Sequence, residues 1–347
     1  MPDAPAVDEA WLQFVDPAGV VRLDGGNATL HWCRVEGRWS LYKRFTDEHR
    51  AAVDEAALVR LIEWRLALPG SVRQRLDAVA AWPRAAVRAA GRATGVLIPA
   101  AGESYFETRA DGRRRPRTLW ELTGGSGPGG SAPPETLTVL GRLILVVRFL
   151  HHLDVVVNDL QQDNVLYRVD GHDTGAYLVD CDSMMSVHWG RVGPVAAPDL
   201  MAEQVPASAE PTILTDLTKL FWVVARVLLE DPSVIGLGPY ERSQLLSAMP
   251  PAARQPLTAL LDNPVDAASW DRLGQQWAVV PAPSAPPAAV PVPHIPAQPR
   301  GWLPAWYSYQ PPPAPPVLPD RLRGGRMARL AGRLVARSGT PGTRIVL

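Results

Sequence analysis

Three polar residues, Asp159, Asn164 and Asp180, flank two short apolar segments that the sequence predicts to form a hairpin. The segments lie on either side of a polar, glycine-containing turn at 170–175, a pattern typical of two antiparallel strands. The open end of such a hairpin places Asn164 beside Asp180, and Asp159 precedes Asn164 by five residues. A carboxylate and an amide oxygen side by side suit a hard cation such as Mg²⁺, which leaves room for phosphate oxygens. Each residue alone could equally be an ordinary turn residue, because Asp and Asn are common in turns.

The chain has 35 basic residues, of which only Lys43 and Lys219 are lysines. Lys43 falls in a predicted strand at 39–45. Because the basic residues other than these two are arginines, a lysine in this strand indicates a role that needs a compact ammonium group. Lys219 follows Asp216 by one helical turn, and for it a local ion pair is the simpler interpretation.

The elements that must position these residues are predicted as a sheet followed by helices. Alternation over 20–45 predicts antiparallel strands with turns at Gly25-Gly26 and Glu36-Gly37, and a further strand is expected over 93–98. Helices are expected over 49–67, 135–152 and 215–230. In the first helix Glu55 falls on the apolar stripe, so we expect it to have a buried cation partner. The fold class is therefore α+β, with a sheet-rich beginning and a helical remainder.

In the order of these features the chain resembles the protein kinase-like superfamily, as a divergent bacterial member with a bilobal fold of the eukaryotic-type Ser/Thr kinases. The resemblance runs from about Val20 to Trp277. Its landmarks are Gly25-Gly26 between the first strands, the strand residue Lys43, Glu55 as the helix glutamate, Gly95–Pro99 near the hinge, Asp159-Leu160-x-x-x-Asn164, Asp180-Cys181-Asp182 in place of Asp-Phe-Gly, Ala196-Ala197-Pro198-Asp199 and the bracing residue Asp216.

The resemblance implies a function for each of these residues in binding ATP and Mg²⁺. Lys43 would hold the α- and β-phosphates, and Glu55, or alternatively Glu63, would position it. Asn164 and Asp180 would hold Mg²⁺, while Asp159 would accept the proton of the acceptor hydroxyl. The backbone at Gly25 and Gly26 would cover the phosphates, and Ile98 would line the nucleotide site near the hinge.

Three departures from the family pattern leave an alternative open. The glycine-rich loop has Ala28 and Thr29 where a third glycine is expected, and Val157-Asn158 replaces the His-Arg of the catalytic loop. Gln161 replaces the catalytic-loop lysine, which would weaken stabilisation of the transferring phosphoryl group. The first interpretation is an ATP- and Mg²⁺-dependent kinase acting on protein Ser/Thr hydroxyls. The alternative is a pseudokinase that binds nucleotide or serves as a scaffold.

The zero net charge of the 347 residues conceals an uneven distribution. Residues 281–319 contain 15 of the 36 prolines, and residues 320–347 contain seven arginines against one acid, so residues 1–280 are acidic. We therefore expect an N-terminal extension at 1–19 and a kinase-like domain at 20–278, divided into lobes at 20–101 and 102–278. A proline-rich linker at 279–319 and a basic amphipathic tail at 320–347 would follow.

Partners and compartment follow from composition. The aromatic segment 302–309 is a candidate docking peptide, and the arginine face of 321–337 could contact an anionic surface; a disordered tail without a specific partner is an equal alternative. Cys33 and Cys181 lack metal-site spacing and are expected to be core thiols in a reducing compartment. With no predicted signal sequence or transmembrane segment, we expect a cytoplasmic protein. His151-His152 would cap a helix or contact solvent.

Overall fold

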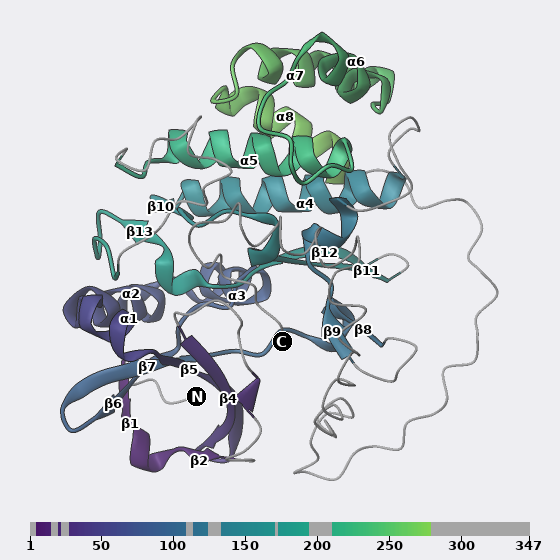
Figure 1. Cartoon of the computed structure of the whole chain (residues 1–347). Helices are drawn as coiled ribbons and strands as arrows, with labels where there is room; N and C mark the ends of the chain where they lie inside the picture. Colours follow the sequence, from purple (N-terminus) through teal and green to yellow (C-terminus); the bar gives the residue numbers. More distant parts are fainter. Residues whose placement is uncertain are drawn as a thin grey trace, which may run out of the picture.

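The computed structural model describes residues 5–14, 20–21, 28–108, 114–123, 133–170, 173–193 and 210–278. Several predicted features lie outside these residues: the Gly25-Gly26 turn, the segment Ala196–Asp199, the proline-rich linker and the basic tail. Within the described residues the expected α+β architecture is confirmed, with a strongly curved sheet at one end and a helical lobe at the other (Figure 1).

The sheet has seven strands in the order β1-β6-β7-β5-β4-β2, with β3 also paired to β4. Its strands are β1 (Ala6–Asp8), β2 (Gln13–Phe14), β3 (Val20–Val21), β4 (Ala28–Val35), β5 (Arg38–Phe45), β6 (Ala85–Ala89) and β7 (Arg92–Ile98). The β4-β5 turn forms at Glu36-Gly37, where both residues have positive φ angles. The segment expected as an N-terminal extension thus contributes β1 and β2 to this sheet.

Lys43 lies on the central strand β5, whose close approach to β7 depends on Gly95. A Cβ atom at Gly95 would lie 2.7 Å from the Tyr42 ring and would also meet the Lys43 backbone carbonyl. Tyr42 is fully buried, and its hydroxyl donates a hydrogen bond to Thr94 at 2.8 Å. A side chain at residue 95 would therefore push apart the two strands that fix the position of Lys43.

The helix expected over 49–67 is divided into α1 (Asp47–Ala52) and α2 (Glu55–Ala67). Asp54 caps α2 by accepting a hydrogen bond from the Ala57 backbone N–H at 3.0 Å. Such a cap starts a new helix, because it satisfies one of the amide donors that the first turn leaves free. A third helix, α3 (Gly70–Val79), was not expected from the sequence.

The helical lobe is built around α4 (Pro134–His151) and α5 (Ile213–Leu228), which lie one above the other in Figure 1. Beyond them are α6 (Pro239–Ser247), α7 (Pro251–Asp262) and α8 (Ala267–Ala278). Gly141 lets α4 and α8 approach closely, because a Cβ atom there would lie 2.5 Å from the Ala278 backbone nitrogen. Four fully buried tryptophans, Trp82, Trp189, Trp270 and Trp277, are among the largest buried side chains.

Three two-stranded pairs lie outside the large sheet. The predicted hairpin forms as β11 (Val165–Asp170) and β12 (Asp173–Leu178), with Val165 opposite Leu178. Two smaller pairs join β8 (Phe106–Thr108) to β9 (Arg114–Pro116) and β10 (Val155–Val156) to β13 (Met185–Ser186). Short 3-10 turns at Glu9–Trp11, Glu103–Tyr105, Leu119–Thr123, Gln162–Asn164 and Cys181–Ser183 complete the described elements.

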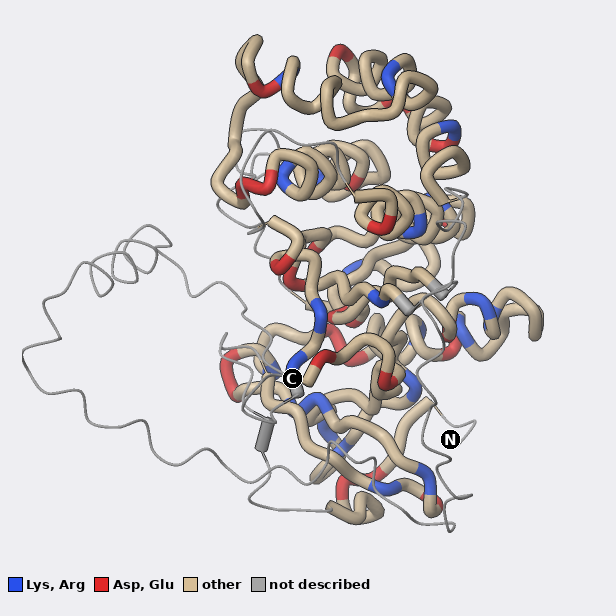
Figure 2. Tube along the Cα trace, turned by 90° about the vertical axis from the view of Figure 1, so that its right-hand side faces the viewer, with Lys and Arg blue, Asp and Glu red and all other residues tan. Residues whose placement is uncertain are grey.

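Basic and acidic residues alternate over both lobes in Figure 2 and do not separate into one basic and one acidic region in this view. Among the helices of the described residues, none combines the length and apolar character needed to span a membrane.

Candidate active site

The open end of the β11-β12 hairpin brings Asn164 and Asp180 together. Asn164 closes the turn before β11, and its backbone carbonyl accepts a hydrogen bond from the Val179 N–H at 3.0 Å. Asp180 follows β12 and adopts a left-handed backbone conformation, with φ at 57° and ψ at 37°. Asp tolerates this conformation better than most residues. It starts a tight turn in which the Ser183 hydroxyl donates to the Asp180 carbonyl at 2.9 Å.

Lys43 reaches this turn from the sheet lobe. Its Nζ donates to Asp180 Oδ1 at 3.0 Å and to Asp182 Oδ1 at 2.7 Å, and the lysine is 7% exposed. Burial acts to lower the pKa of Lys43, but attraction to the two carboxylates outweighs it and raises the pKa above its usual range. Lys43 is therefore a fully charged ammonium group held between residues more than 130 positions away in the chain.

Glu55 is not the partner of Lys43, and this corrects the expectation from the sequence. It is the first residue of α2, where its carboxylate accepts a hydrogen bond from the Ala93 N–H at 3.0 Å and lies 3.8 Å from Arg88. Glu55 keeps its place on the apolar side of the helical wheel, but α2 begins at this residue, so its side chain lies at the helix end and contacts β6 and β7 instead of Lys43. The alternative, Glu63, is exposed on the same helix.

Asp159 is in contact with Asn164 and with Gln161. Asn164 Nδ2 donates to Asp159 Oδ2 at 2.8 Å, and Gln161 Nε2 donates to Asp159 Oδ1 at 3.2 Å. Burial, together with repulsion from the Asp180 carboxylate, raises the pKa of Asp159 to about 6. The charge of Lys219 and the Asn164 hydrogen bond act in the opposite direction. The result is a carboxyl group poised to exchange a proton near neutral pH.

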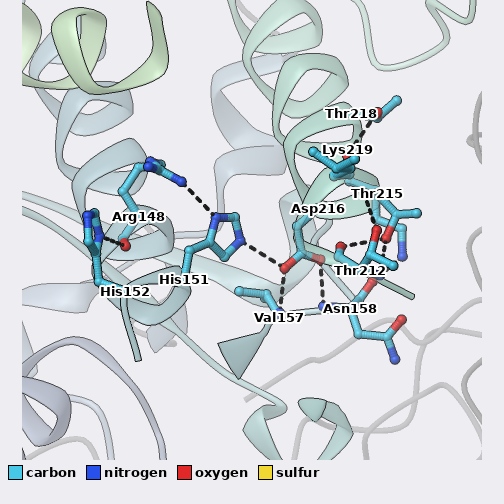
Figure 3. A network of polar contacts seen from close by, with 11 residues as sticks. Arg148, His151, His152, Val157, Asn158, Thr212, Thr215, Asp216, Thr218 and Lys219 are labelled. Atoms are coloured by element: carbon cyan, nitrogen blue, oxygen red, sulfur yellow. Dashed lines mark hydrogen bonds and ion pairs between the residues drawn. The ribbon is translucent and has the colours of Figure 1, made fainter. Parts of the chain in front are cut away.

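The backbone before Asp159 is held by a buried network that begins at α5 (Figure 3). Asp216 is fully buried and accepts hydrogen bonds from the backbone N–H groups of Val157 at 2.6 Å and Asn158 at 2.8 Å. His151 Nε2 lies 3.1 Å from the same carboxylate, and its Nδ1 lies 3.3 Å from an Arg148 nitrogen. Since a guanidinium can only donate, Nδ1 must accept and the proton is on Nε2. His151 therefore braces Asp216, contrary to the capping or solvent role expected from the sequence.

Lys219 completes this network from the next turn of α5. It is 2% exposed, and its Nζ donates to the backbone carbonyl of Asn158. Burial lowers the pKa of Lys219, while the Asp216 and Asp159 carboxylates partly restore it. Asp216 thus accepts from the backbone N–H groups before Asp159, and Lys219 donates to the Asn158 carbonyl. Together they hold Asn158 in a left-handed conformation with φ at 66°. The sequence predicted a local ion pair for Lys219. The structure instead shows Lys219 in contact with the loop that carries Asp159.

The side chains on the hairpin fit a bound Mg²⁺ ion. Asn164 is 2% exposed, and while its amide nitrogen is hydrogen bonded, its Oδ1 is a buried oxygen without a hydrogen-bond partner. An orphaned buried acceptor is costly unless a ligand satisfies it. No cluster of three or more His, Cys, Asp or Glu side chains suited to a metal occurs among the described residues. Mg²⁺ does not need such a cluster, because it retains waters and phosphate oxygens as ligands.

The remaining predicted residues are placed as follows. Ile98 ends β7 opposite Leu41 and is 7% exposed, while Gly25 and Gly26 lie outside the described residues. Cys33 and Cys181 are free and buried, as expected for core thiols, and burial raises the pKa of both. Asp182, His151 and the loop contact of Lys219 were not predicted. Each makes its contact with a segment distant in the sequence.

Comparisons with known proteins give matches among solved structures alone. No family model matches the sequence, and no curated protein matches it. Among the solved structures that match is a double mutant of the kinase domain of PknI from Mycobacterium tuberculosis. The two chains are 14% identical, with a TM-score of 0.48 over 79% of this chain and 97% of the other. The function of the chain is therefore inferred from the geometry of the site.

Proposed function

We propose that the chain is an ATP- and Mg²⁺-dependent phosphotransferase that acts on Ser or Thr hydroxyls of a protein. Its domain would comprise the lobes expected at 20–101 and 102–278, with β1 and β2 added to the sheet of the first lobe. The observation that supports this proposal is the convergence of Lys43, Asp180, Asn164 and Asp159 from separate elements, with a buried Asn164 oxygen that lacks a partner. Lys43, Asp180 and Asn164 are suited to binding phosphate and metal, and Asp159 is suited to accepting a proton.

Each residue has a defined part in the proposed reaction. The Lys43 ammonium attracts the phosphate oxygens of the substrate ATP as a point charge. Asn164 Oδ1 and the Asp180 carboxylate would hold Mg²⁺, which supplies neutralising charge at the phosphates when bound. Asp159 orients the acceptor hydroxyl and takes its proton as the oxygen forms its bond to the γ-phosphorus. The bond between that phosphorus and the β-γ bridging oxygen breaks, and ADP leaves.

A pseudokinase remains the second candidate, favoured by the contacts of Gln161. Its amide donates to one oxygen of the Asp159 carboxylate, while Asn164 donates to the other. A carboxylate that accepts two hydrogen bonds is a weaker base. Gln161 also brings no positive charge to the position where the family has a lysine. Under this alternative the site would bind nucleotide without transferring phosphate.

A γ-phosphate transfer assay on the full chain separates the two candidates. Wild type is compared with Asp159→Asn and Asp180→Asn, using a general protein acceptor and the chain itself as substrates. Transfer that both substitutions abolish supports the kinase. If no transfer occurs but ATP and Mg²⁺ together raise the melting temperature of wild type and not of Asp180→Asn, the pseudokinase is supported. If ATP and Mg²⁺ leave the melting temperature unchanged, the site assignment is wrong.

We also propose a setting for this activity. The aromatic segment 302–309 would dock a partner protein, and the arginines of 321–337 would contact an anionic surface. A reducing compartment such as the cytoplasm is suggested by the two thiols, both of which are buried and free.

A further inference from the structure

Asp182 is a buried carboxylate that the proposed reaction does not use. It is the last residue of Asp180-Cys181-Asp182 and is 7% exposed. Its Oδ1 accepts the shorter of the two hydrogen bonds from Lys43, 2.7 Å against 3.0 Å for Asp180. A buried carboxylate is expensive unless it is paired, so the contact with Lys43 accounts for its presence in the core.

The turn that carries Asp182 is built to present two carboxylates to one ammonium group. The left-handed conformation of Asp180 starts the turn, and Cys181 points the other way, with 1% of its surface exposed and its Sγ donating to the Leu178 carbonyl. Residues 180 and 182 therefore share one side of the turn, and residue 181 anchors the opposite side in the core.

Lys43 has one positive charge and two carboxylate partners. If Asp180 binds Mg²⁺, its negative charge is directed to the metal, and Lys43 needs another partner to stay in place. Helix α2 does not supply one, because Glu55 is engaged by Ala93 and Arg88 and Glu63 is exposed. Among the ion pairs of the described residues, Asp182 is then the partner left to Lys43.

We propose that Asp182 is a positioning residue that anchors Lys43 in the role the family gives to a helix glutamate, and so frees Asp180 for Mg²⁺. This inference rests on the proposed function. In this arrangement the position of Lys43 is set by β5 and the 180–183 turn, while Glu55 of α2 is engaged elsewhere.

Amine acetylation tests the anchor without nucleotide, because the chain has only two lysines. The full chain is treated with an acetylating reagent, and modification of Lys43 and Lys219 is followed by peptide mass spectrometry. Asp182→Asn is expected to speed acetylation of Lys43 about tenfold, since a buried charge-assisted hydrogen bond is lost. Glu55→Gln, which can still accept from Ala93, is the matched control and should leave the rate unchanged. Lys219 reports on folding and should react equally slowly in every variant.

Two results would overturn the inference: a Lys43 rate in Asp182→Asn equal to wild type, or an equal increase in Glu55→Gln. If acetylation of Lys219 also rises in Asp182→Asn, that variant is unfolding. The inference is then tested with Asp182→Glu. This variant keeps a carboxylate in the turn, so the inference requires it to react at least several-fold more slowly at Lys43 than Asp182→Asn does. Equal rates in the two variants contradict the inference.

Nucleotide binding distinguishes failure of the anchor from failure of the proposed function. Asp182→Asn should weaken ATP binding about tenfold and keep its dependence on Mg²⁺, whereas Asp180→Asn should lose that dependence. If wild type does not bind ATP with Mg²⁺, the proposed function fails, while the acetylation rates still report on the anchor. If Asp182→Asn binds ATP as wild type does, the positioning role is refuted even though the site binds nucleotide.

Discussion

Replacing Asp159 with asparagine should stabilise the fold and abolish the proposed reaction. Burial, reinforced by the nearby Asp180 carboxylate, raises the pKa of Asp159 from 3.8 to about 6. The folded protein therefore binds this proton more tightly than the unfolded chain does. Below about pH 4 the group is neutral in both states and costs nothing. As the pH rises through 6 the folded state must ionise a poorly solvated carboxyl group, and stability is lost.

The shift sets the size of the effect. A difference of about two pKa units corresponds to about 3 kcal/mol at pH 8, since each unit is worth 1.36 kcal/mol. An asparagine keeps one acceptor oxygen for Asn164 but accepts fewer hydrogen bonds in total, and this loss destabilises the variant by about 1 kcal/mol. The net stabilisation is about 1–3 kcal/mol, equivalent to a rise in melting temperature of roughly 3–10 °C for a domain of this size.

Thermal denaturation of wild type and Asp159→Asn at pH 8 and at pH 4.5 measures this difference. The gain should be present at pH 8 and should shrink by at least half at pH 4.5. Asp47→Asn is the matched control, because its side chain is 92% exposed and the change should alter the melting temperature by no more than about 1 °C at either pH. A lower melting temperature for Asp159→Asn at both pH values would refute the reasoning, since Asp159 would then be a structural acceptor whose charge costs nothing.

The raised pKa of Asp159 also predicts how the transfer activity depends on pH. A neutral carboxyl group cannot accept the proton of an acceptor hydroxyl, so transfer by wild type should fall as the pH drops through about 6. Transfer by Asp159→Asn should be lower at every pH, by at least a hundredfold. Stability and activity moving in opposite directions on one substitution is the expected signature of a functional carboxylate.

Three further substitutions test the framework around the site, and one truncation tests the tail. Lys43→Arg should weaken ATP binding by about tenfold in a calorimetric titration, since a guanidinium cannot fit both carboxylates as the ammonium does. Gly95→Ala should lower stability by about 1–3 kcal/mol in urea denaturation through its contact with the Tyr42 ring. His151→Ala should cost about 1–3 kcal/mol, because the buried Asp216 loses a donor. Removing residues 321–347 should abolish binding to anionic vesicles and leave the melting temperature unchanged; retained binding would contradict the proposed role of the arginines.

The parts of the site that could be predicted are those that lie close together in the sequence. Asn164 and Asp180 flank one hairpin, and Asp159 precedes it by a single turn, so strand pairing alone brings these residues together. The α+β order, a sheet followed by helices, followed from periodicity for the same reason, whereas the two lobes were implied by the family resemblance. In the described residues the strands β4, β5 and β7 and the helices α4 and α5 start and end within a few residues of their predicted bounds.

Contacts between distant segments could not be predicted in this way. The pairing of Lys43 with Asp182 spans 139 residues, and that of Lys219 with Asn158 spans 61. Nothing local marks either partner. The error at Glu55 was different, because its cause is visible in the sequence. Asp54 is a favoured N-cap residue, and a helix starting there puts Glu55 in its first turn, away from the core.

Both lysines of the chain lie at the same site, and the chemistry of their surroundings explains why neither is an arginine. Lys219 is 2% exposed, and its side chain donates to a single carbonyl, that of Asn158. A guanidinium at this position would bring five N–H donors into a place that offers one acceptor, and the unsatisfied donors would destabilise the fold. Lys43 faces two carboxylate oxygens at 2.7 and 3.0 Å, a geometry that a small ammonium satisfies directly. Attraction from both lysines lowers the pKa of Asp159 against the effect of its burial. The two ammonium groups therefore partly offset the effects of burial and of the Asp180 charge on this pKa, and losing either one should move the acidic limb of the activity profile to higher pH.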